Sequence, residues 1–80
     1  MSRFLFGLGE MVTWQTTQGR QLTGTVIKVL APYKLPGKQF PRLGIRVKMG
    51  RDHESYVVEV EIDGQKKHFW PRVGDLRAAV

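Results

Sequence analysis

The sequence predicts an all-β protein: one small domain whose five short strands form a partly open barrel. Three observations carry this prediction. Hydrophobic residues alternate with polar ones at a period of two, not at the 3.6 of a helix. Asp63-Gly64 stands between two such segments, as expected for a tight hairpin turn. The chain has 80 residues, 41% of them hydrophobic and 25% charged, with no cysteine, so a thin core must hold a single domain without disulfides.

The first two expected strands lie in the first third of the chain. Residues 11–14 are short and rich in β-forming side chains, and residues 23–30 are longer. Residues 15–20 connect them, with Gly19 as the turn residue. Gly24 inside the second strand indicates a bulge or a sharp bend, which a small barrel needs at its corners.

The other three expected strands are residues 45–49, 56–62 and 66–70. In the third strand Ile45, Val47 and Met49 share one face. The Asp-Gly turn fixes the register of the last two strands. It pairs Glu61 with Lys66, Glu59 with His68, Val58 with Phe69 and Val57 with Trp70.

Three further segments complete the organisation. Residues 31–43 contain three prolines and one glycine and form a long loop, which we expect to be exposed over residues 31–42. Residues 73–79 form a short helical turn with Leu76 pointing inward. Residues 1–8 are an apolar tail that packs on the barrel or on a neighbouring subunit, and residues 9–80 are the barrel domain. Five strands at this spacing, followed by a short C-terminal helical turn, predict the SH3-like class of small barrel.

Short motifs in the chain resemble known families. Gly9-Glu-Met-Val-Thr-Trp14, Gly24-Thr-Val26 and Tyr56-Val-Val58 resemble the bacterial hypervirulence-associated Tudor-like domains and, more broadly, SH3-like barrels of the Tudor and KOW type. This resemblance implies an SH3-like binding domain.

A weaker resemblance concerns the end of the chain. Lys67-His-Phe-Trp-Pro71 followed by Leu76 is similar to the final strand of the type II, trimethoprim-resistant dihydrofolate reductases. The pore-lining Gln-Ile-Tyr of that family is replaced by His68, Phe69 and Trp70. The resemblance therefore implies a barrel that could form a homo-oligomer, without the reductase activity.

The charge of the chain favours a polyanionic partner. Thirteen Lys and Arg residues against seven Asp and Glu give a net charge of +6 and a pI near 10.2. Residues 1–50 hold eight of the basic residues and only one of the acidic ones. The leading hypothesis is a non-catalytic module that binds DNA or RNA with little sequence specificity, through outward lysines and arginines and two aromatic rings of the loop. The expected contacts are Lys28, Tyr33, Lys34, Lys38, Phe40, Arg42, Arg46 and Lys48. The alternative is a basic surface that serves solubility alone, with both rings holding the loop in place.

Two other functions stay open at this point. An outward Val57–Trp70 pair, together with the apolar tail, would mark a protein-contact or self-association surface. The third possibility is a small enzyme that forms a homo-oligomer, with His68 and Phe69 lining a shared pore. Trp14 and Phe69 are otherwise expected in the core.

Neither catalysis nor cofactor binding is expected. The serines stand in no catalytic motif, and His53 lies in a polar turn. No spacing of the two histidines suggests a metal site. We therefore expect no enzyme, cofactor, metal or small-molecule substrate, and a cytoplasmic protein without a membrane segment.

Overall fold

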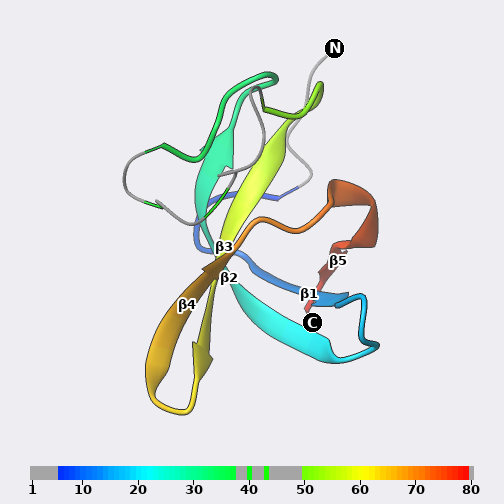
Figure 1. Ribbon diagram of the computed structural model, residues 1–80, viewed down its shortest axis with the longest axis vertical. Coiled ribbons are helices and arrows are strands. Elements are labelled where there is room, and N and C mark those ends of the chain that lie inside the picture. The colour runs from blue at the N-terminus through cyan, green and yellow to red at the C-terminus, as the bar shows by residue number, and fades with distance from the viewer. Residues whose placement is uncertain (1–5, 38–39, 41–42, 44–49, 80) are drawn as a thin grey trace.

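A computed structural model describes residues 6–37, 40, 43 and 50–79 of the chain. Five antiparallel strands form one sheet in the spatial order β4-β3-β2-β1-β5 (Figure 1). The sheet is open, with β4 and β5 as its edges in the described part of the chain. The elements are β1 (Met11–Gln15), β2 (Gln21–Leu30), β3 (Ser55–Ile62), β4 (Gln65–Phe69), the 3₁₀ helix η1 (Val73–Asp75) and β5 (Arg77–Ala78). The predicted all-β class, with five strands and a short helical turn near the C-terminus, is confirmed.

The β3–β4 hairpin has the predicted turn and register. Asp63 and Gly64 have φ angles of 53° and 77°, the two positive values that a type I′ turn requires. Val58 lies opposite Phe69 and Glu61 opposite Lys66, as expected. The expected Glu59–His68 pair is present at 3.1 Å, but Lys66 Nζ lies 3.9 Å from the other Glu59 oxygen instead of pairing with Glu61 opposite it. The hairpin projects from the rest of the sheet, as Figure 1 shows.

The bulge in β2 lies three residues after Gly24, where a bulge or a sharp bend is expected from the sequence. The register with β3 shifts between Val26 and Lys28, so Ile27 is the bulged residue. Gly24 has another role. A Cβ at this position would collide with the Glu59 carbonyl and lie 2.8 Å from a Val58 methyl, so glycine allows β3 to cross closely over β2.

The fifth strand of the sheet is not the one expected. Residues 44–49, which include the whole of the predicted third strand, lie outside the described residues. The fifth strand is β5, whose two residues pair with Val12 and Thr13 of β1. A two-residue strand is too short for periodicity to reveal. The helical turn is correspondingly shorter than the predicted residues 73–79, and no helix in the described ranges is long enough to cross a membrane.

The main core lies on one face of the sheet. Trp14 and Phe69 pack edge to face with ring centroids 5.7 Å apart, as expected for core residues. Phe6, from the predicted tail, is also buried and packs against Tyr56. The buried members of this core are Phe6, Val12, Trp14, Leu22, Val26, Tyr56, Val58, Val60 and Leu76. The apolar tail thus packs on the domain at Phe6, whereas Leu8 is exposed; Phe4 and Leu5 lie outside the described residues.

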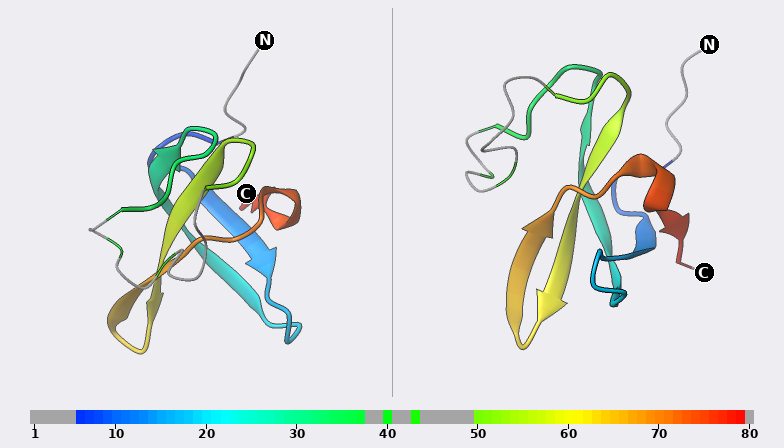
Figure 2. Two further views of the ribbon diagram at one scale, coloured as in Figure 1. Left: turned by 45° about the horizontal axis from the view of Figure 1, so that its top comes forward. Right: turned by 45° about the vertical axis from the view of Figure 1, so that its right-hand side comes forward.

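A second, smaller cluster lies on the opposite face of β3. Leu30, Phe40 and Val57 are its buried members, with Trp70 among the half-buried residues packed against them. Because the bulge at Ile27 changes the alternation of β2, Lys28 and Val57 become direct neighbours. Phe40 and Leu43, from the segment after β2, pack on this face, so β3 has apolar contacts on both sides. Figure 2 shows this segment beside the β2–β3 pair.

Candidate functional site

The predicted interface falls on the segment that follows β2. We use the name basic loop for the whole segment of residues 31–51 between β2 and β3, of which residues 31–37, 40, 43, 50 and 51 are described. Six of the thirteen basic residues and none of the seven acidic ones fall in it, so the rest of the chain is neutral overall and the whole charge of +6 belongs to this loop. Four predicted contacts, Lys38, Arg42, Arg46 and Lys48, lie outside the described residues.

Two of the predicted contacts have structural roles instead. Phe40 is only 9% exposed, and its ring packs edge to face on His68 with centroids 5.0 Å apart. Lys28 was expected to point outward, but it is half-buried under the loop, where Nζ donates to the Pro36 carbonyl at 3.0 Å. Its ammonium also lies 5.8 Å from the centre of the Phe40 ring. Pro36 and Phe40 are both buried, so the expectation of exposure throughout residues 31–42 is wrong at these two positions.

Tyr33 and Lys34, by contrast, are exposed as predicted. Tyr33 is 58% exposed and has a φ of 67°, in the left-handed region that residues with side chains seldom occupy. Its amide donates to the Arg51 carbonyl at 2.6 Å, and its carbonyl accepts from the Gly50 amide. These bonds join the two ends of the basic loop. Gly50 is required there because a Cβ would collide with the Lys34 backbone.

Arg51 is the functional candidate that the sequence analysis missed. Its guanidinium lies 4.3 Å from the centre of the Trp70 ring and donates to the Trp70 and Pro71 carbonyls at 2.9 and 2.8 Å. Burial, and secondarily the charge of Arg72, lower the pKa of Arg51 from its usual value. The available signal was its place at the end of an acid-free run of basic residues.

The two members of the expected outward Val57–Trp70 pair differ in burial. Val57 is fully buried beneath the basic loop. Trp70 lies beyond the end of β4 and is half-buried, and its Nε1 donates to Ser55 Oγ at 2.9 Å. Of the expected hydrophobic pair, only part of the Trp70 side chain therefore remains exposed.

The carboxylates and histidines form local pairs. His68 Nε2 lies 3.1 Å from Glu59, and His53 Nδ1 lies 2.7 Å from Asp52 in the exposed turn. His68 faces the side of β4 opposite to Phe69, which packs in the main core. In the described part of the chain, no three His, Asp or Glu side chains are grouped so that they could hold a metal ion.

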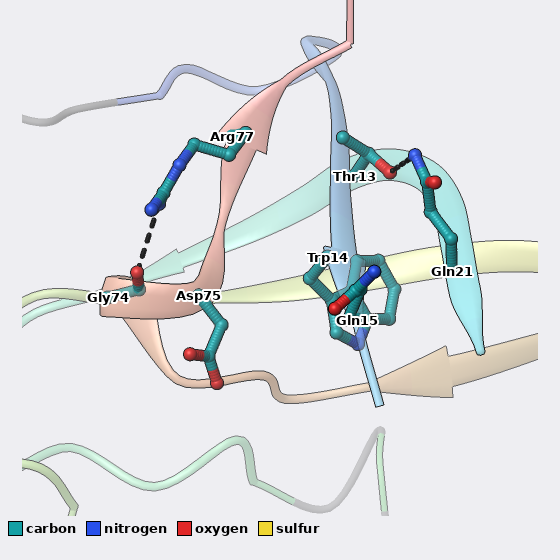
Figure 3. Close-up of a pocket in the computed structure, with 7 residues that line it drawn as sticks. All are labelled: Thr13, Trp14, Gln15, Gln21, Gly74, Asp75 and Arg77. Carbon is teal, nitrogen blue, oxygen red and sulfur yellow. Dashed lines mark hydrogen bonds between the residues drawn. The ribbon is translucent and has the colours of Figure 1, made fainter. Parts of the chain in front are cut away.

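Two cavities open to solvent near η1. The first, of about 360 Å³, lies between β1, β5 and η1, where Gln21 donates to Thr13 and Arg77 to the Gly74 carbonyl (Figure 3). The second, of about 570 Å³, is lined by Arg51, Asp52, His53, Arg72, Val73, Gly74 and Asp75. We call it the arginine cavity. Asp75 lines both, and its side chain extends into the first in Figure 3.

Comparison with known proteins adds no relative: no family profile, no curated protein and no solved structure matches this chain. The function must therefore be argued from the residues themselves.

Proposed function

We propose that the protein is a non-catalytic nucleic-acid-binding module that uses the basic loop. One observation carries the proposal: the entire net charge of the chain falls in 21 consecutive residues, the span from position 31 to 51, among which no acidic residue occurs. A loop of this charge attracts phosphates and releases their counterions, which gives affinity without sequence specificity.

The attachment of the loop supports the same function. Pro36 and Phe40 are buried against the sheet, and the backbone bonds of Tyr33 to Gly50 and Arg51 join the loop ends. Lys34 and Arg51 lie next to these attachments, and a charged side chain that is already positioned loses less conformational freedom on binding than one on a free tail. In the described residues, Lys28 and Arg51 bond to backbone carbonyls and not to carboxylates, so their charges are not neutralised by these bonds.

The test is a titration of labelled DNA at several salt concentrations. We expect the affinity of the unchanged protein to fall steeply as salt rises. Changing Lys34, Lys38 and Arg42 together to Gln should weaken binding to single strands and duplexes alike. The slope of log K against log salt should fall by about 0.7 per lost contact on a single strand and about 0.9 on a duplex.

The matched control removes three positive charges elsewhere. Changing Arg20, Lys66 and Lys67 together to Gln alters the net charge equally, at exposed positions outside the loop. We expect a much smaller loss of affinity. Equal losses from the two triple variants would mean that total charge alone drives binding, and no binding at low salt would refute the proposal.

A further inference from the structure

The exposed ring of Tyr33 indicates which form of nucleic acid the loop prefers, an inference that rests on the proposed function. We propose that the protein binds unpaired strands in preference to duplexes. One base stacks on Tyr33, and neighbouring phosphates lie along Lys34 and the arginine cavity.

Only one of the two loop aromatics is available to a base. Phe40 is packed against His68 and Lys28, whereas Tyr33 is 58% exposed. The faces of bases inside a duplex are covered by their neighbours, so an exposed ring can stack on a base only where the strand is unpaired. The charges of the loop attract both forms, and Tyr33 therefore distinguishes them.

The backbone holds Tyr33 in a fixed place. A φ of 67° is unfavourable for a residue with a side chain, and here two backbone hydrogen bonds, to Gly50 and Arg51, maintain it. The ring gains little burial in return. A stacking platform that is already ordered binds a base at a lower entropic cost than a ring on a free segment.

The backbone connects this platform to the arginine cavity, since the Tyr33 amide donates to the carbonyl of Arg51, which lines the cavity. Arg51 is fixed on Trp70, and Arg72 is exposed at the cavity wall. Both arginines line the cavity, and the charge of Arg72 acts on Arg51, so the two positive charges together favour an anion there. Two carboxylates share this wall: Asp52 already pairs with His53, and Asp75 also lines the first cavity. A phosphate next to the stacked base fits this position.

The experiment measures the affinity of three proteins for two probes: an oligothymidylate of about ten nucleotides and a duplex of the same length. The unchanged protein should bind the single strand more tightly. Tyr33→Leu should weaken single-strand binding roughly 5- to 100-fold, the effect of one lost stacking interaction, and leave duplex binding nearly unchanged. Tyr33→Phe keeps the ring and should keep the preference. Equal affinity of the unchanged protein for both probes, or equal losses on both probes in Tyr33→Leu, would overturn the inference while leaving the proposed function intact.

A second pair of variants tests the path of the phosphates. Arg72→Gln should weaken binding of both probes and lower the single-strand salt slope by about 0.7. Arg20→Gln removes the same charge from the β1–β2 turn and should change neither quantity measurably. If the two variants behave alike, the arginine cavity takes no part. If the unchanged protein binds neither probe at low salt, the proposed function itself fails, and the inference fails with it.

Discussion

The two faces of β3 differ in a way that explains most of the molecule. On one face, Tyr56, Val58 and Val60 form part of the main core. On the other, Val57 is also fully buried, whereas Glu59 is half-buried and Glu61 is exposed. Alternation predicts which residues share a face, but it does not predict that Phe40 and Leu43 of the following segment pack on part of the second face. The basic loop thus closes a second cluster as well as carrying the charge.

The largest expected effect comes from placing a charge on each face in turn. Val57→Asp and Val58→Asp should destabilise the protein by similar amounts, each more than about 3 kcal/mol, because both carboxylates would be buried without a partner. Gln65→Asp, at an exposed strand position, is the control and should cost less than about 0.5 kcal/mol. Urea denaturation measures all three. A Val57→Asp variant as stable as Gln65→Asp would show that the second face is open to water.

The next largest expected difference in stability is between variants of the two aromatic residues of the basic loop. Phe40→Ala should lower the free energy of unfolding by about 3 kcal/mol, since it removes a buried ring from the second cluster. Tyr33→Ala should change it by less than about 0.5 kcal/mol, because that ring is exposed. Similar values in thermal or urea denaturation would contradict the division of roles between these residues.

A substitution in the β3–β4 hairpin turn should have a smaller effect on stability. Gly64→Ala places a side chain at a φ of 77° and should cost about 1 kcal/mol. Gly74→Ala is the matched control, because Gly74 has no positive φ and a Cβ there would meet no atom within 4 Å. We expect the control to change stability by less than about 0.5 kcal/mol. Equal costs in the two variants would argue against the type I′ turn.

The smallest expected effect on stability comes from the glutamates of β3, which lie on the same face as Val57. Glu59→Gln removes the carboxylate that His68 and Lys66 approach and should cost about 0.2–1 kcal/mol, as is usual for ion pairs near the surface. Glu61→Gln should cost less still, because Lys66 reaches Glu59 instead. A larger loss of stability from Glu61→Gln than from Glu59→Gln, measured in the same urea titration, would indicate that Lys66 pairs with Glu61 directly opposite it.

The elements predicted well from the sequence are those fixed by local rules. The Asp63-Gly64 turn sets the hairpin register because its backbone geometry admits only one loop length. Trp14 and Phe69 were placed in the core by strand alternation and residue type. The bulge at Ile27 and the two-residue β5 have no comparable local signal. They depend on how β2 crosses β3 and on how Leu76 packs into the core.

The candidate site was predictable in its charge but not in its contacts. The excess of basic residues can be counted directly. The sequence gives no means to distinguish Tyr33 from Phe40, because both are aromatic residues near prolines in one long loop. Their different burial depends on the sheet beneath them, as does the stacking of Arg51 on Trp70. These contacts join residues far apart in the chain, which periodicity does not address.

The central claim is that the basic loop binds nucleic acid. An NMR titration of the isotope-labelled protein with oligothymidylate at low salt tests this claim most directly. We predict that amide signals shift at residues 31–37, 50–53 and 72–74. The turns at residues 16–20 and 63–64 should not respond. Shifts concentrated in those two turns, or no shifts at all, would contradict the account.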